Sequence, residues 1–242
     1  GMSNYAKYGP VNPFTNTLTD EEIMAITSEE LIDIIRNMTS YEHRVLYYGP
    51  KSFEETEKSV AELHPIPSEL NAIKEVEDFK ELDINKTSVY VIDYDMKQAE
   101  ILMVAKGQKF NAEKMPLIKL HNEYFGGSMG SIVFQTLRES KALAYSVYSA
   151  YSTPRENDKS HYVTAYIGTQ ADKLAEAMVG MNELLTTIPE VEANLENAKE
   201  AVIQKIRTER ITKDRVLFNY ESAKRLGYDY DSRKDIFDNI NK

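Results

Sequence analysis

The sequence predicts an α+β domain in which a largely antiparallel mixed sheet carries helices packed on one face. Two pairs of strand-like runs, 88–94 with 100–106 and 145–152 with 161–168, are each joined by a polar connection and predict two hairpins. Helical periodicity fills much of the chain between and after these hairpins. The composition does not change along the 242 residues, and no internal repeat or low-complexity tract interrupts them, which favours one domain.

The N-terminal segment differs in character from the rest of the chain. Residues 1–18 contain Pro10 and Pro13 and show no hydrophobic period, which is typical of an irregular linker. We therefore expect a linker over 1–18 and a single domain over 19–242.

Three helix starts are marked by capping boxes, in which a Ser or Thr is followed three residues later by a Glu. The pairs are Thr19 with Glu22, Thr27 with Glu30, and Ser52 with Glu55. Between the second and third helices, residues 43–48 are dense in β-branched and aromatic side chains and stop at Gly49-Pro50, which predicts a strand. Residues 64–87 contain two prolines, Pro65 and Pro67, and then a charged stretch, which predicts a connection.

The second half of the chain predicts further helices around the second hairpin. Residues 116–125 form one helical pattern that ends at two glycines, and 128–140 form another. The segment 171–242 is helical, with apolar residues recurring at helical spacing.

Composition excludes several classes of function. The chain has 29 basic and 39 acidic side chains and a net charge of −10, which argues against a nucleic-acid partner or an anionic membrane surface. It has no cysteine, which excludes disulfides, thiolate zinc sites and cysteine nucleophiles. Its longest apolar runs are short, and no signal peptide or membrane span is indicated.

The four histidines do not form a metal motif. Residues 39–43 resemble H-x-x-E-H, but the first position is Thr39, which cannot replace an imidazole ligand. His121 and Glu123 are two residues apart on a predicted helix and do not share a face. No partner at ligand spacing accompanies the two remaining histidines, His64 and His161. We therefore expect no metal ligands and no cofactor in this chain.

Nucleophile and phosphate motifs are also absent from the sequence, since it contains no G-x-S-x-G, P-loop or G-x-G-x-x-G. The run 126–130 has glycines at Gly126, Gly127 and Gly130, which could offer backbone N–H groups to an anion. Without a lysine beside them, a junction that needs positive φ and close packing explains these glycines better.

Arg138 and Tyr145 are the other candidate pair. Arg138 lies in the last turn of a predicted helix and Tyr145 opens a predicted strand, so the two can converge on one surface. A guanidinium and a phenol both donate hydrogen bonds suited to a peptide carbonyl or a developing oxyanion. Composition alone favours a plainer interpretation, in which Arg138 complements a helix C-terminus and Tyr145 is part of the core.

Residues 122–147 also carry a longer pattern, N-x-x-F-G-G-x-M-G-S-x-x-F-Q-x-L-R-E-x-x-x-L-A-Y-S-V. This pattern resembles the signature of the pitrilysin family of zinc metallopeptidases, whose relatives include insulysin and the mitochondrial processing peptidase. The resemblance is specific over 122–147 and looser over most of the chain, through the order of its elements. It implies the α+β metallohydrolase domain that this family repeats.

The resemblance also implies a division of labour. In the family, one half holds zinc through H-x-x-E-H and a distant Glu, and the opposite half, without the metal motif, contributes an Arg and a Tyr near the scissile bond. These match Arg138 and Tyr145 as catalytic residues, and the family's glycine-rich segment matches Gly126, Gly127 and Gly130 as substrate-binding residues. The chain therefore resembles the non-metal C-terminal domain of a longer protein, with zinc expected in the partner domain.

Three hypotheses follow. In the first, the chain clamps a peptide or unfolded polypeptide against a catalytic half in the same polypeptide or a partner subunit, and is inactive alone. In the second, it is an inactive relative that serves as a structural or binding subunit. In the third and weakest, it is a self-sufficient metal enzyme that uses His43 or His121.

Overall fold

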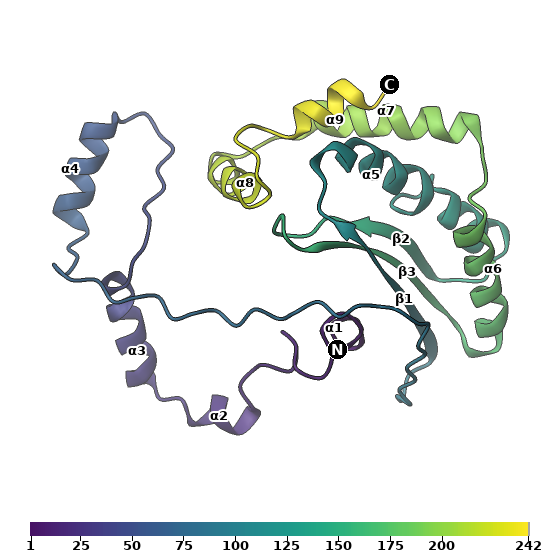
Figure 1. Cartoon of the computed structure of the whole chain (residues 1–242), viewed down its shortest axis with the longest axis horizontal. Coiled ribbons are helices and arrows are strands. Elements are labelled where there is room, and N and C mark those ends of the chain that lie inside the picture. Colours follow the sequence, from purple (N-terminus) through teal and green to yellow (C-terminus); the bar gives the residue numbers. More distant parts are fainter. Residues whose placement is uncertain (242) are drawn as a thin grey trace.

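The computed structural model describes residues 1–241, and it has the α+β architecture that the sequence predicts. A three-stranded antiparallel sheet lies beneath helices from the C-terminal half of the chain (Figure 1). In chain order, the helices and strands are α1 (Met2–Tyr8), α2 (Asp20–Ala25), α3 (Ser28–Asn37), α4 (Phe53–Leu63), β1 (Gln98–Lys109), α5 (Met115–His121), β2 (Ser146–Ser152), β3 (Ser160–Gln170), α6 (Leu174–Thr186), α7 (Glu192–Thr208), α8 (Lys213–Arg225) and α9 (Arg233–Asn239).

The sheet has the strand order β1-β3-β2, and both pairings are antiparallel. Ile101, Ile167 and Val147 occupy one row across the three strands; Ile167 and Val147 are buried in the hydrophobic core, and Ile101 packs against it. Because side chains alternate along a strand, the neighbouring row of Leu102, Tyr166 and Tyr148 points to the opposite face. The sheet thus has a core face and an opposite face, called the open face below, which α1 covers around Tyr162.

The core is built from the C-terminal half of the chain. Four large side chains, Phe125, Leu137, Ile167 and Met181, are fully buried. The first lies at the end of the helical segment after α5, the second in the helical segment before β2, the third in β3 and the fourth in α6. Burying a side chain of this size contributes about 1.5–3 kcal/mol. A second cluster joins α7 to the C-terminal helix, through Val202, Ile203, Ile236 and Ile240.

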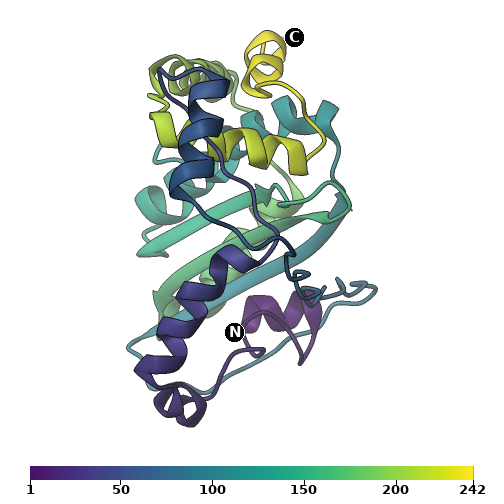
Figure 2. The same ribbon diagram turned by 90° about the vertical axis from the view of Figure 1, so that its left-hand side faces the viewer.

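The N-terminal region lies apart from this core. All three capping boxes form as predicted, with the side-chain and backbone hydrogen bonds of each box present at the starts of α2, α3 and α4. These three helices contain no buried residue, and Figure 1 shows them on the side of the molecule away from α6. Seen after a quarter turn, α3 and α4 lie in front of the sheet and of the C-terminal helices (Figure 2).

The prediction of the first hairpin, over 88–94 and 100–106, is wrong. Residues 88–94 form no ladder with β1, and residues 43–48, also predicted as a strand, are extended without a partner strand. Both segments are rich in β-formers, and Val91 remains 87% exposed. β-propensity describes how well a side chain fits a half-buried pleated surface, so it produces a strand only where a neighbouring strand is present. The second hairpin, over 145–152 and 161–168, is confirmed as β2 and β3.

Two further details differ from the sequence-based expectation. Residues 2–8 of the expected linker are helical, because α1 packs against β1 and Lys7 lies 4.6 Å over the ring of Tyr162. The helical segments predicted at 116–125 and 128–140 are α5 continued by a π-helical segment, η3 (Asn122–Gly126), and a second π-helical segment, η4 (Phe134–Ser140). No helix within residues 1–241 has the length and apolar character needed to cross a bilayer.

Candidate substrate-binding site

The segment that follows α5 is fastened to the edge of the sheet at two points. The Asn122 side-chain amide donates to the Tyr151 carbonyl at 3.0 Å, and its oxygen accepts from the Tyr151 backbone N–H at 2.7 Å. One turn further, Gly126 is buried so close to β2 that a Cβ there would lie 2.3 Å from the Ser149 carbonyl oxygen. Asn122 and Gly126 therefore fix η3 on the outer edge of β2.

The turn between η4 and β2 is closed by two hydrogen bonds, one of them from a threonine side chain, and by two buried leucines. The Leu143 N–H donates to the Leu137 carbonyl at 2.8 Å, and the Thr169 hydroxyl donates to the Leu143 carbonyl at 2.6 Å. Leu137 and Leu143 are both buried in the core. The residues that flank these anchors, Arg138 and Tyr145, are thereby placed at the two ends of one tight turn.

Arg138 projects from the last part of η4 into solvent. Its guanidinium lies 4.7 Å from the centroid of the Phe134 ring, and its side chain is 46% exposed. The carboxylate of Glu139 lies 3.9 Å from Nε, which is a loose ion pair at an exposed site and holds the side chain weakly. Most of the donors of Arg138 are therefore available to an incoming acceptor.

Tyr145 is 54% exposed, which excludes the plainer interpretation that it is a core residue. Its backbone N–H donates to the Gly168 carbonyl at 2.9 Å, which fixes the residue at the end of β2 next to β3. The Gln170 side-chain amide donates to the Tyr145 hydroxyl at 2.8 Å. This hydroxyl accepts one hydrogen bond and keeps its own proton to donate. Gln170 was not identified from the sequence, because nothing in its spacing connects it to Tyr145.

The three candidate glycines have different environments. None of them has positive φ, so the conformational reason expected from the sequence does not apply, whereas the close packing does apply to Gly126. A Cβ on Gly127 would lie 2.7 Å from the Asn122 carbonyl oxygen. Gly130 is exposed, and its nearest neighbour to a Cβ would be the Ser128 hydroxyl at 4.0 Å.

The histidines do not fit a zinc site. His43 and His64, which have no useful spacing in the sequence, approach each other with their Nε2 atoms 2.8 Å apart, while Nδ1 of His43 donates to the Tyr41 carbonyl at 2.6 Å. Protein zinc sites use three or four ligands. Within residues 1–241, no three histidine or acidic side chains come together to hold a metal ion. The pair of His43 and His64 therefore lacks the further ligand that a protein zinc site needs.

His121 packs against a neighbouring ring. Its ring stacks on Phe125 with centroids 5.3 Å apart, and burial lowers the pKa of His121 below its ordinary value. The neighbouring Glu123 is paired instead with Lys205 of α7. The side chains of His121 and Glu123 thus serve packing and helix contacts.

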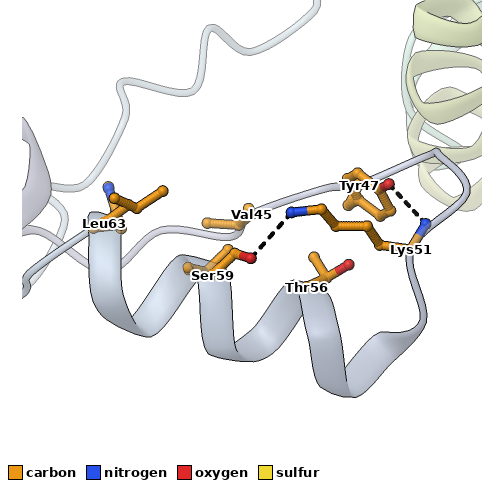
Figure 3. A pocket seen from close by; sticks show the side chains of 8 residues that line it. Val45, Tyr47, Lys51, Thr56, Ser59 and Leu63 are labelled. Atoms are coloured by element: carbon orange, nitrogen blue, oxygen red, sulfur yellow. Dashed lines mark hydrogen bonds between the residues drawn. The ribbon is translucent and has the colours of Figure 1, made fainter.

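A pocket of about 300 Å³ lies in the N-terminal region, between α4 and the extended segment 43–48 (Figure 3). Lys51 is engaged within it, since its Nζ donates to the Ser59 hydroxyl at 3.1 Å and its backbone N–H donates to the Tyr47 hydroxyl at 3.1 Å. The segment that carries Arg138 packs instead on α6, at the other side of the molecule in Figure 1. This pocket is separate from the Arg138 and Tyr145 turn.

The fold first defines a class of protein, an α+β domain whose helices cover one face of an antiparallel sheet and whose described residues offer no three-ligand metal cluster. A family model described as the peptidase M16 inactive domain matches residues 25–202. The chain therefore belongs to the M16 inactive-domain family, as the pattern over 122–147 indicated.

A curated protein resembles this chain in sequence, and solved structures resemble it in fold. An uncharacterized zinc protease, YmxG of Bacillus subtilis (strain 168), is 36% identical over 109 residues, which are 44% of this chain and 26% of that protein. The crystal structure of a peptidase M16 inactive domain from Pseudomonas fluorescens has a TM-score of 0.66 at 17% identity, over 98% of this chain and 57% of that one. The ferredoxin protease FusC, solved in complex with Arabidopsis ferredoxin, has a TM-score of 0.61 at 15% identity, over 99% of this chain and 27% of that one. The chain thus spans only part of the length of these relatives.

Proposed function

We propose that this chain is the substrate-binding half of a zinc-dependent endopeptidase and presents peptide to a catalytic H-x-x-E-H half outside this sequence. The observation that carries this proposal is the turn between η4 and β2. It places two exposed hydrogen-bond donors, Arg138 and Tyr145, at the ends of a segment whose intervening leucine is buried. Exposed donors held by a rigid turn are suited to binding a partner's carbonyl groups.

Each side chain has a distinct role in this proposal. The Arg138 guanidinium offers a planar fork of N–H donors to one or two peptide carbonyl oxygens. The Tyr145 hydroxyl, oriented by the hydrogen bond from Gln170, donates its proton to the oxygen on which negative charge develops. In the partner half, zinc would supply the activated water.

The glycine-rich segment contributes backbone groups to the same surface. Gly127 and Gly130 are exposed between η3 and η4, where a peptide could approach their backbone closely, while Gly126 sets the position of this segment against β2. Closure of the two halves over the peptide would exclude water and bring Arg138 and Tyr145 to the reacting bond.

The test uses Arg138→Ala and Tyr145→Phe in the protein that joins this chain to its catalytic half. Removing one donor to a developing oxyanion costs on the order of 100-fold to 1000-fold in rate. We expect kcat/KM on a peptide substrate to fall by about this much in Tyr145→Phe, with zinc content unchanged. Arg138→Ala should lower kcat/KM and raise KM, since it removes substrate-binding contacts.

Matched controls are available on the helices. Arg207 also stacks on a phenylalanine ring, at 5.4 Å from Phe237, and Tyr220 is similarly exposed at 51%. Arg207→Ala and Tyr220→Phe should leave kcat/KM unchanged. If Arg138→Ala and Tyr145→Phe also stay within a factor of two of the wild type, the proposed role is wrong. If no catalytic half exists in the same polypeptide or a neighbouring gene, the alternative of a structural or binding subunit replaces it.

A further inference from the structure

The open face of the sheet carries a strip of side chains beside Tyr145 that the proposed function does not use. The strand register places Gln98 opposite Gln170, Glu100 opposite Gly168, and Leu102 opposite Tyr166. These residues alternate with core residues along their strands and therefore point away from the C-terminal helices. The strip begins at Gln170, whose amide donates to the Tyr145 hydroxyl, and continues along β3 from there.

Two tyrosines form an aromatic surface in this strip. Tyr148 of β2 and Tyr166 of β3 are register partners, and their rings stack with centroids 5.3 Å apart and planes inclined by 21°. Tyr148 is 41% exposed, and its neighbour Leu102 across β3 is 36% exposed. Aromatic rings have a negative face that attracts a cation placed over it.

Glu100 supplies a carboxylate next to these rings. A Cβ on Gly168 would lie 3.0 Å from the Tyr166 hydroxyl, so the tyrosine extends along the strand over the glycine toward the register position of Glu100. Burial raises the pKa of Tyr166, and the negative charge of Glu100 and a hydrogen bond with it raise this pKa further. The carboxylate and the phenol therefore lie within interaction distance.

Two lysines on this face of the sheet are engaged elsewhere, and one of them, Lys7, lies 4.6 Å over the ring of Tyr162. Lys106 lies further along the strand, where its Nζ is 3.1 Å from the carboxylate of Asp83 and 4.0 Å from that of Glu81. The chain as a whole carries a net charge of −10. The carboxylate of Glu100 therefore lies beside a pair of aromatic rings, in a protein whose net negative charge attracts cations.

From this juxtaposition we propose that Glu100, Tyr148 and Tyr166 form a subsite for a lysine or arginine side chain of an extended peptide. The proposal rests on the proposed function, because the same peptide would reach Tyr145 at the end of the strip. Its cation would lie over the exposed tyrosine face and pair with the Glu100 carboxylate. The methylene stem of such a side chain would cover the apolar surface of Leu102.

The expected preference is modest because the strip is partly exposed. A cation–π contact and a surface ion pair each contribute a small amount at such a site, and together they predict roughly fivefold to tenfold tighter binding of a cationic side chain than of a neutral one. Raising the ionic strength to about 1 M should reduce this preference, because exposed charges are then screened.

The test titrates this chain with a short capped peptide that has a central lysine, and with the same peptide carrying norleucine in its place. Binding is followed by the NMR resonances of the tyrosine rings, which report affinities into the millimolar range. We expect the lysine peptide to bind roughly fivefold to tenfold more tightly and to shift the resonances of Tyr148 and Tyr166. Glu100→Gln and Tyr148→Leu should each remove most of this preference.

Glu176→Gln is the matched control, since Glu176 is an exposed carboxylate in the first turn of α6, on the other side of the sheet. It should leave the preference unchanged. Equal binding of the two peptides, ring resonances that do not shift, or equal losses in Glu100→Gln and Glu176→Gln would each overturn the subsite. The proposed function fails separately, when kcat/KM is insensitive to Arg138→Ala and Tyr145→Phe.

Discussion

Ala142 lies in the turn between Arg138 and Tyr145 and has a φ of 49°. No other non-glycine residue that the structure describes has a positive φ. In the left-handed region a Cβ approaches the following carbonyl oxygen and costs roughly 1–2 kcal/mol. Three contacts hold the turn in this conformation, namely the two leucine anchors on either side and the hydrogen bond from Lys173 Nζ to the Ala142 carbonyl at 3.0 Å. The strain is located where the candidate site needs a tight turn.

Replacing Ala142 with glycine should therefore stabilise the protein. Glycine removes the Cβ conflict but loses more entropy on folding, and the difference leaves a gain of about 0.5–1 kcal/mol in the free energy of unfolding. Urea denaturation measures it. Ala175→Gly, at an exposed position in the first turn of α6, is the control and should destabilise by up to about 1 kcal/mol. A loss of stability in Ala142→Gly would contradict the strained turn.

His121 gives the stability a defined dependence on pH. Because burial lowers the pKa of His121 in the folded protein, the unfolded chain binds the proton more readily, at the ordinary pKa of 6.5. The contribution of neutral His121 to the free energy of unfolding is then fully present above about pH 6.5, and it is lost as the pH drops through the lower folded pKa.

The measurement is the change in Tm between pH 7.5 and pH 5 for the wild type and for His121→Gln. We expect a smaller change in the variant, because it lacks the histidine that binds a proton more readily in the unfolded chain. The carboxylates are common to both proteins, so their contribution to the change in Tm cancels in the comparison. His43→Gln, which removes an exposed histidine, should behave as the wild type does. An identical pH dependence in all three proteins would show that His121 is not buried in solution.

Among the elements, those with local causes were predicted well. The capping boxes at Thr19, Thr27 and Ser52 form because their hydrogen bonds connect residues three apart. The strands predicted at 43–48 and 88–94 do not form, because a strand needs a partner that local sequence does not specify. The hydrogen bonds between Asn122 and Tyr151 were not predicted either, because they too join residues that are far apart in the sequence. In the candidate site, Arg138 and Tyr145 were a candidate pair from their predicted places at a helix end and a strand start, and the family pattern then favoured them over the plainer interpretation.

The docking of η3 on β2 predicts opposite outcomes for two glycines of the same segment. Gly126→Ala would place a Cβ 2.3 Å from the backbone oxygen of Ser149, which cannot move without disturbing the sheet. We expect a loss of about 2–3 kcal/mol or more in the free energy of unfolding by urea, as for overpacked cores. Gly130→Ala meets open space and should change stability by less than about 0.5 kcal/mol. Equal effects at both positions would exclude this packing.

Across the whole molecule, stability is distributed unevenly. The sheet and the helices over it contain the buried clusters, whereas the N-terminal helices α2, α3 and α4 bury no residue. The ion pair of Arg44 with Glu221, at 2.6 Å, joins the segment before α4 to α8. Surface ion pairs of this kind contribute at most about 1 kcal/mol, so the N-terminal part can open without unfolding the core.

Native-state hydrogen exchange tests this distribution directly. The amides of Ala165 and Ile167 lie in β3, between two strands and under the helices, and should exchange only on global unfolding. The amides of 88–94 have no ladder partner, and Val89 and Val91 are 83% and 87% exposed, so they should exchange orders of magnitude faster. Protection of 88–94 equal to that of β3 would mean that this segment pairs in solution. The first hairpin indicated by its sequence would then exist, and β1 would no longer be an edge strand.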